Sequence, residues 1–142
     1  MQIKKSESQE QQTVMAWAEI MQRRYPELQM LFHVPNEGKR SKAAGGQLKA
    51  MGLKSGVLDI YLDFPAGKYH GLRIELKVEK NKPTQEQDRW LKNLNAVGYF
   101  AAVCYGAAQA ERVLEDYIRL KPGHPMALEK YIDPAVGYLI LK

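Results

Sequence analysis

Two short apolar stretches joined by a turn-like segment constrain the fold of this chain more than any other feature. Residues 56–62 (Gly-Val-Leu-Asp-Ile-Tyr-Leu) and 72–78 (Leu-Arg-Ile-Glu-Leu-Lys-Val) are rich in aliphatic and β-branched side chains, which favour strands. Residues 64–71, between them, contain one proline and two glycines, a composition typical of turns. The sequence therefore predicts a β-hairpin with antiparallel strands.

Three charged side chains fall on one face of this predicted hairpin. Glu75 and Lys77 are separated by one residue, and because side chains alternate along a strand, both point to the same face. Asp59 lies on the neighbouring strand, where it can meet them across the sheet. Two adjacent carboxylates cost free energy unless a cation lies between them, so the pattern favours a divalent-metal site that assists cleavage of a phosphodiester. The same residues would also suit the solvent-exposed face of an amphipathic sheet.

The composition is that of one globular domain. The chain has 142 residues, of which 45% are hydrophobic, enough for a core at this size. No apolar run approaches the ~18 residues of a membrane span, and the first residues lack the apolar region of a signal peptide. Cys104 is the only cysteine, which excludes an internal disulfide, and its apolar surroundings predict a buried, unreactive thiol. We therefore expect a cytoplasmic protein with no membrane partner.

The net charge of +5 and the pI of about 9.3 suit a polyanionic partner. Basic residues flank the predicted acidic centre on both sides along the chain: Lys39, Arg40, Lys42, Lys49 and Lys54 before it, and Lys77, Lys80 and Lys82 after it. Lysines scattered over the surface for solubility would give the same net charge.

The remaining sequence predicts helices that alternate with strands. Apolar spacing and helix-ending prolines and glycines predict helices over residues 8–24, 41–52, 83–97 and 107–120, and strands over 30–34 and 99–105. Thr84 and Gln87 form a capping-box pattern at the start of the third helix. The strand, helix, strand passage from Glu75 to Tyr105 implies parallel strands. We expect an α/β fold, with a small mixed sheet flanked by helices.

The C-terminal segment, residues 121–142, is too apolar for a free tail, since it contains Tyr131, Ile132, Tyr138 and Leu139. It could add an edge strand to the sheet, or it could bury itself against a second copy of the chain.

Four segments, in this order and spacing, resemble the virus-type replication-repair nuclease (VRR-NUC) domain, a branch of the PD-(D/E)XK nuclease superfamily. They are Phe-His-Val-Pro-Asn-Glu-Gly-Lys-Arg at 32–40, Gly-Val-Leu-Asp at 56–59, Glu-Leu-Lys at 75–77 and Gln-Asp-Arg-Trp-Leu at 87–91. The resemblance implies a restriction-endonuclease-like core, with a nuclease domain over residues 1–120 and an extension over 121–142 that packs on the domain or at a dimer interface. The family usually has proline before the catalytic aspartate, where this chain has Leu58.

The resemblance also implies roles for the residues of the predicted centre. Asp59 and Glu75 would bind Mg²⁺ or Mn²⁺, with the backbone carbonyl of Leu76 as a further hard oxygen ligand. Lys77 would orient or deprotonate the attacking water and stabilise charge on the phosphate.

Two helical side chains would complete the implied catalytic site. We expect a glutamate of the first helix there, Glu10, with Glu7 as the alternative because the register of the helix is open by one turn. A solvent-exposed position remains the simplest alternative for Glu10. Gln87 would face the metal site, serve only as a capping residue, or do both.

DNA contacts are expected in the basic segments. Asn36, Lys39 and Arg40 form a polar loop that could hold phosphates, and the further DNA-binding candidates are Lys42, Lys54 and Lys80. We expect His33 to position the turn at Asn36 rather than act as a general base, and Trp90 to lie in the core rather than stack on a base.

These features together predict a Mg²⁺- or Mn²⁺-dependent DNA endonuclease. The chain has no recognisable base-reading module, so recognition of DNA shape is expected. The stand-alone phage and bacterial members of the family imply a homodimer that cuts branched DNA, such as four-way (Holliday) junctions, in replication, recombination or repair. The alternatives are flap or single-stranded DNA substrates, a ribonuclease activity, and a non-catalytic DNA-binding subunit.

Overall fold

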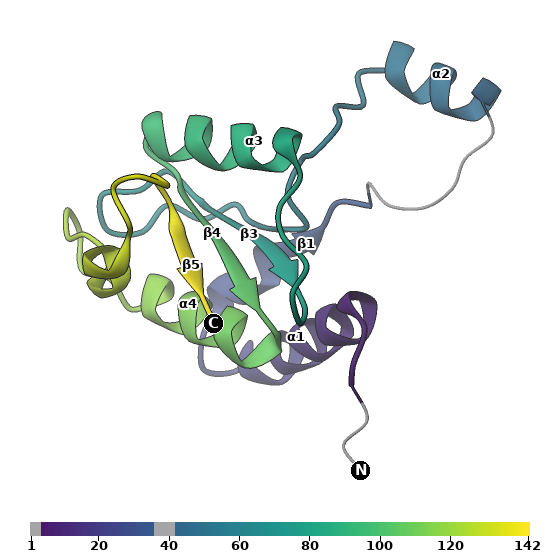
Figure 1. Ribbon diagram of the computed structural model, residues 1–142. Coiled ribbons are helices and arrows are strands. Elements are labelled where there is room, and N and C mark those ends of the chain that lie inside the picture. Colours follow the sequence, from purple (N-terminus) through teal and green to yellow (C-terminus); the bar gives the residue numbers. More distant parts are fainter. Residues whose placement is uncertain (1–3, 36–41) are drawn as a thin grey trace.

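A five-stranded mixed sheet with helices on both faces forms the body of the molecule, as the computed structural model shows for residues 4–35 and 42–142 (Figure 1). The strands are β1 (Leu31–His33), β2 (Ile60–Leu62), β3 (Leu72–Lys77), β4 (Phe100–Tyr105) and β5 (Leu139–Leu141), in that order across the sheet. The helices are α1 (Glu7–Met21), α2 (Lys42–Ala50), α3 (Gln85–Ala96) and α4 (Ala107–Ile118), with 3₁₀ turns at Pro26–Met30 and Ala127–Tyr131. This architecture confirms the predicted α/β fold.

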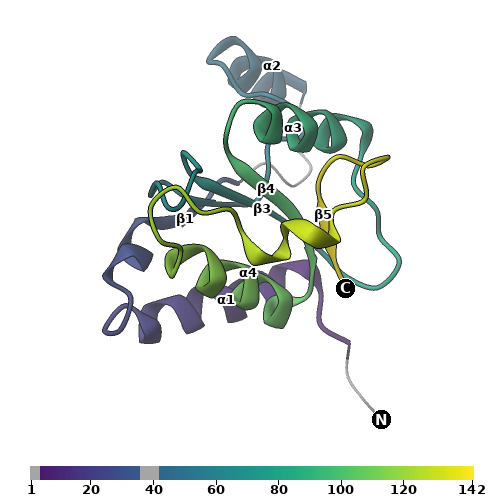
Figure 2. The same ribbon diagram turned by 90° about the vertical axis from the view of Figure 1, so that its left-hand side faces the viewer.

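The sheet lies between two helical layers. Helix α3 packs on β4 from one side, and α1 and α4 pack together against the other side (Figure 2). Most of the buried side chains belong to the α1–α4 side, including Val14 and Ala18 of α1 and Leu114 of α4. A smaller cluster around Leu91 of α3 fills the opposite side. Because helices cover both of its faces, β4 is an almost unbroken buried apolar run, as is typical of parallel strands.

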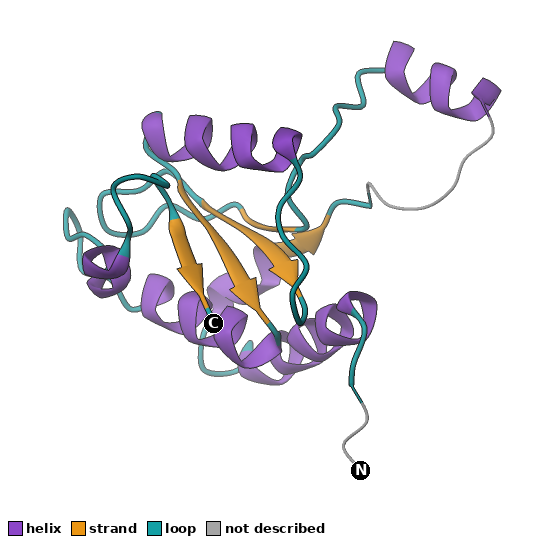
Figure 3. Ribbon diagram, in the orientation of Figure 1, coloured by secondary structure: helices purple, strands orange, loops and turns teal. Residues whose placement is uncertain are grey.

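The predicted hairpin and crossover are both present (Figure 3). Strands β2 and β3 are antiparallel, with Ile60 opposite Ile74. Strands β3 and β4 are parallel, and α3 connects them along the chain. Strand β2 is shorter than the predicted 56–62. Gly56 has a φ of +78°, and a Cβ there would lie 2.5 Å from the Cβ of Glu86, so the chain turns under the start of α3 instead of extending the strand.

Helix α1 starts one residue earlier and ends three residues earlier than the predicted 8–24. Ser6 caps it, accepting a hydrogen bond from the backbone N–H of Gln9, whose side chain in turn accepts one from the Ser6 N–H. Val14 and Ala18 are buried, and Trp17 packs against the same core, as the helical spacing predicted.

The C-terminal segment adds the edge strand that was one of its two predicted roles. Strand β5 pairs in parallel with β4, and Leu139 and Tyr138 are buried against it. Met126 and Leu128, earlier in the segment, are also buried in the core. The segment therefore packs on the same domain as residues 4–35 and 42–120, and burial against a second copy stays a prediction.

Helix α2 stands away from the sheet, on the side where α3 begins (Figure 1). It covers most of the predicted 41–52, and Met51, directly after it, is 77% exposed. Across the described parts of the chain, no helix has both the length and the hydrophobicity that crossing a membrane requires.

Candidate active site

Asp59 and Glu75 lie close together at one end of the hairpin. The backbone N–H of Asp59 donates to the carbonyl of Ile74 at 3.1 Å, and its carbonyl accepts from Val34 at 3.0 Å, so strands on both sides hold this residue. Asp59 directly precedes the paired residues of β2, and its side chain reaches the backbone N–H of Leu76, the residue after Glu75. The fold therefore brings the two predicted carboxylates together, as the hairpin pattern required.

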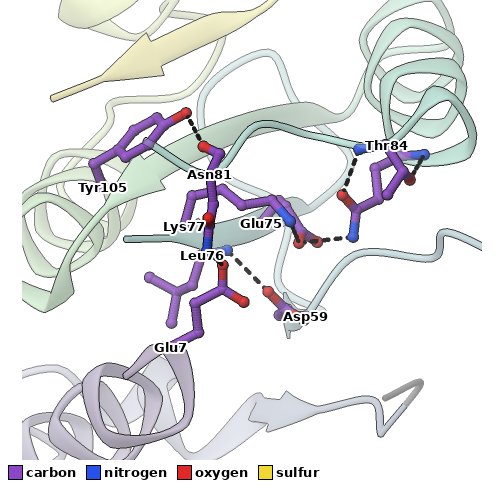
Figure 4. A network of polar contacts seen from close by, with 9 residues as sticks. Glu7, Asp59, Glu75, Leu76, Lys77, Asn81, Thr84 and Tyr105 are labelled. Carbon is purple, nitrogen blue, oxygen red and sulfur yellow. Dashed lines mark hydrogen bonds and ion pairs between the residues drawn. The ribbon is translucent and has the colours of Figure 1, made fainter. Parts of the chain in front are cut away.

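A network of short polar contacts joins this pair to its neighbours (Figure 4). The Oε2 atom of Glu75 lies 3.2 Å from the Lys77 ammonium and accepts a hydrogen bond of 2.9 Å from the Gln87 side-chain amide. The Oδ2 atom of Asp59 accepts a 2.9 Å hydrogen bond from the backbone N–H of Leu76. Four of the five predicted catalytic residues thus meet at one site.

The site is unusually buried for a group of charges. Asp59, Glu75 and Lys77 are only 6%, 1% and 7% exposed. Burial and the negative charge of Asp59 together raise the pKa of Glu75 to about 9, because Lys77 offsets only part of their effect. The remaining oxygen of Glu75, Oε1, is buried without a hydrogen-bond partner. A buried carboxylate with an unpaired oxygen is costly on its own.

These donors fit a hard divalent cation. Carboxylate oxygens suit Mg²⁺ and Mn²⁺, and Mg²⁺ is commonly bound through one or two carboxylates while it keeps several waters. The unpaired Oε1 of Glu75 and the nearby Asp59 carboxylate supply oxygens of this kind. In residues 4–35 and 42–142, no group of three or more His, Cys, Asp or Glu side chains forms a metal site. A cation here would therefore also need backbone or water oxygens.

The two glutamates of the first helix make different contacts. The Oε2 atom of Glu10 accepts a 2.8 Å hydrogen bond from the backbone N–H of Ala107, at the start of α4. The Glu7 side chain extends from α1 toward the end of β3 and accepts a 3.4 Å hydrogen bond from Asn81 (Figure 4). Glu10 thus binds the first N–H of α4, whereas Glu7 faces the loop that follows β3.

Gln87 forms the predicted cap and also contacts Glu75. Its Oε1 accepts from the backbone N–H of Thr84, closing the predicted capping box at the start of α3. Its Nε2 donates to Glu75. The cap therefore fixes the rotamer that orients one oxygen of Glu75.

His33 supports the site from β1. Its Nδ1 lies 2.8 Å from the Asp59 carbonyl, and because a carbonyl only accepts, Nδ1 carries the proton. The bond steadies the backbone that presents Asp59. The predicted contact of His33 with the turn at Asn36 lies outside the described residues.

The predicted DNA-binding residues are only partly described. Asn36, Lys39 and Arg40 lie outside the described residues, as does the side chain of Lys42. Lys54 and Lys80 are exposed, on the segments that lead into Asp59 and away from Lys77.

Trp90 packs against the Leu91 cluster and donates to the Ser55 carbonyl at 3.0 Å, which confirms a packing role. Cys104 is fully buried, as predicted, and burial raises the pKa of its thiol.

The sequence did not single out Asn81 and Tyr105. The Tyr105 hydroxyl donates to the Asn81 carbonyl at 2.6 Å, and the Asn81 amide reaches Glu7. An asparagine between two lysines is typical of an ordinary turn, so only the fold reveals its position beside the site.

An α/β fold that presents an aspartate and a Glu-x-Lys sequence on adjacent strands is the architecture of a nuclease domain. The chain belongs to the VRR-NUC domain family, whose sequence model matches residues 5–108. Among solved structures it is similar to a protein described as a VRR_NUC domain protein, with 29% sequence identity and a TM-score of 0.72, over 87% of this chain and 98% of that one. No match was found among curated proteins. Membership of this family implies a nuclease-type function in DNA processing.

Proposed function

We propose that this chain is a Mg²⁺- or Mn²⁺-dependent DNA endonuclease. The observation that carries the proposal is the buried Glu75 carboxylate, which lies close to Asp59, beside Lys77, and keeps one oxygen without a hydrogen bond. Burial and the second carboxylate raise the pKa of Glu75 to about 9. So large a shift is typical of functional sites rather than of residues that only support the fold.

Each residue of the site has a distinct task in this reaction. Asp59 and Glu75 would hold the cation, together with the backbone carbonyl of Leu76. When bound, the cation would supply Lewis-acid stabilisation of negative charge and a more acidic water. Lys77, whose ammonium lies 3.2 Å from Glu75, orients the attacking water and stabilises the phosphate oxygens.

Two further residues position these groups. Gln87 donates to Glu75 Oε2, which leaves Oε1 free of hydrogen bonds and available as a ligand. Glu7 takes the place proposed for the first-helix carboxylate, because its side chain reaches the loop that follows β3.

Branched DNA is the substrate that we propose first. The net charge of +5 supports binding to the phosphate backbone, and no familiar base-reading element occurs among the described helices and strands. A homodimer would place two active sites on two strands of a four-way junction, in keeping with the two-fold symmetry of such assemblies. Flaps and single-stranded DNA rank second.

The experiment that tests this proposal is cleavage of a labelled panel: four-way junction, flap, splayed arm, duplex, single-stranded DNA and RNA. Each is incubated with Mg²⁺, Mn²⁺ or EDTA, and Lys77→Ala is run beside the parent chain. Paired nicks in the junction that vanish with EDTA and with Lys77→Ala are expected. Cutting of flaps or single strands alone would contradict the proposed branched-DNA substrate but support the proposed cleavage mechanism. Cutting of RNA alone would make the chain a ribonuclease. Tight DNA binding with no cleavage of any member would indicate a binding subunit.

A further inference from the structure

An aromatic ladder lies beside the proposed active site. Phe32 of β1, Tyr61 of β2 and Arg73 of β3 are direct cross-strand partners. Tyr61 lies two residues after Asp59, and Arg73 lies two residues before Glu75. Since side chains alternate along a strand, Glu75 points to the same face of β3 as Arg73, so the ladder lies on the face of the sheet that carries Glu75.

The ladder is held firmly at its inner end. The guanidinium of Arg73 lies 4.0 Å from the centre of the Tyr61 ring and 4.9 Å from that of Tyr99, and it forms a 3.0 Å ion pair with Asp63. A cation packed on an aromatic face in this way fixes the ring and is itself stabilised. The Tyr61 phenol, whose ordinary pKa of 10.0 is raised by burial, is neutral at neutral pH and does not repel a phosphate.

The outer end of the ladder is open. The Phe32 and Tyr61 rings lie 5.3 Å apart at an angle of 51°, and Phe32 is 40% exposed. Because Phe32 is exposed to this extent on an edge strand, it contributes little to the core. Covering its ring with a ligand would be favourable, since burial of apolar surface lowers the free energy. A flat, exposed ring that packs on a second ring fixed by a cation suits the face of a nucleic-acid base.

The spacing along the strands places the ladder close to the proposed active site. Two residues along a strand correspond to about 7 Å, so the ladder row lies one nucleotide or so from the Asp59–Glu75 row. A phosphate bound at the carboxylates would thus carry its neighbouring base to Phe32. A paired base inside a duplex offers its edges in the grooves rather than its face, so only an unpaired base can stack there.

We propose that Phe32 and Tyr61 form a stacking platform for an unpaired base next to the scissile phosphate, with Arg73 as the residue that positions Tyr61. This inference rests on the proposed nuclease function and narrows it. The substrate class becomes DNA with at least one unpaired base beside the cut, as at a flap, a gap or an opened branch point.

The test compares two DNAs of equal length and charge, one fully paired and one with a short unpaired stretch. Fluorescence anisotropy in EDTA gives the Kd of the parent chain, Phe32→Ala, Phe32→Trp and the control Ile20→Ala, which removes a 72% exposed apolar side chain from α1. Circular dichroism checks that each variant is folded. We expect Phe32→Ala to bind the unpaired DNA about tenfold more weakly and the duplex unchanged, while Phe32→Trp and Ile20→Ala bind both DNAs as the parent does.

Three results would overturn the platform: a parent chain with no preference for the unpaired DNA, a Phe32→Ala variant that matches the parent, or one that loses affinity equally for both DNAs. Cleavage in Mg²⁺ separates this failure from that of the proposed function. If Lys77→Ala stops cutting while Phe32→Ala changes nothing, only the platform fails. If Lys77→Ala cuts as fast as the parent, the nuclease mechanism itself fails.

Discussion

At the scale of single residues, Glu75 is the side chain whose environment says most about its task. Without a cation, burial and Asp59 favour its protonated form, because the pKa rises to about 9. A glutamine, which is neutral and of the same shape, should therefore fit the metal-free protein well. The same substitution removes an oxygen ligand of the proposed metal site, so its effects on stability and on activity should separate.

We predict that Glu75→Gln lowers the cleavage rate at saturating Mg²⁺ by at least about 100-fold, as expected for loss of a metal-held charge in the transition state. Stability in EDTA below about pH 4.5 should change by less than about 1 kcal/mol, since both side chains are then neutral in the folded and in the unfolded chain. Cleavage kinetics and urea denaturation measure the two effects. Glu19→Gln, an exposed change on α1, is the matched control and should alter neither. If Glu75→Gln cleaves DNA at the parent's rate, Glu75 has no role in the cleavage mechanism.

The pH dependence of stability follows from the same shift. A carboxyl whose pKa is higher in the folded than in the unfolded chain binds its proton more tightly when folded, so it stabilises the fold at low pH. For Glu75 this contribution is complete below about pH 4.5 and is lost as the pH rises toward about 9. In EDTA, the free energy of unfolding of the parent should fall across this window relative to Glu75→Gln. Equal slopes for the two proteins, measured by urea denaturation at several pH values, would contradict the raised pKa.

At the scale of elements, the predicted parts of the site are those that local sequence determines. The alternation around Glu75 and Lys77 determines a face of β3, and Thr84 with Gln87 determines the start of α3. Whether Glu7 or Glu10 reaches the site depends on how α1 docks against α4, a tertiary contact that leaves no local signal. The parallel pairing of β5 with β4 joins distant segments and is likewise invisible in the apolar pattern alone.

Gly56 determines how closely the segment before Asp59 approaches α3. Its φ of +78° disfavours any other residue, and a Cβ would meet the backbone N of Gln87 at 2.8 Å. We predict that Gly56→Ala destabilises the protein by about 1–3 kcal/mol and also slows cleavage, because it displaces the helix start that positions Gln87. Urea denaturation and cleavage kinetics provide the two measurements.

The matched control is Gly45→Ala in α2, where an added Cβ meets nothing within 4 Å. It should leave the global stability within about 0.5 kcal/mol of the parent, because the substitution fills open space and alanine favours the helix. Equal effects of the two substitutions would show that the close approach at Gly56 is unimportant.

At the scale of the whole molecule, the distribution of charge determines how DNA approaches the site. The net charge is +5, and Lys54 and Lys80 lie on the two segments that border the acidic pair. Binding to phosphates releases counterions, so each phosphate contact contributes about 0.9 to the slope of log K against log salt concentration. The slope of log K against log salt concentration therefore reports the number of phosphate contacts, whatever the shape of the DNA.

We predict that Lys54→Gln and Lys80→Gln each lower this slope by about 1, and that the double variant lowers it by about 2, because each lysine would neutralise one phosphate. Anisotropy titrations with a four-way junction in EDTA, between about 50 and 200 mM salt, measure the slope. Lys130→Gln is the control, since Lys130 lies in the C-terminal 3₁₀ turn, where its ammonium packs on Tyr131. A control that lowers the slope as much as the two site variants would mean that DNA binds by net charge alone. An unchanged slope in all three single variants would place the DNA contacts on other basic residues.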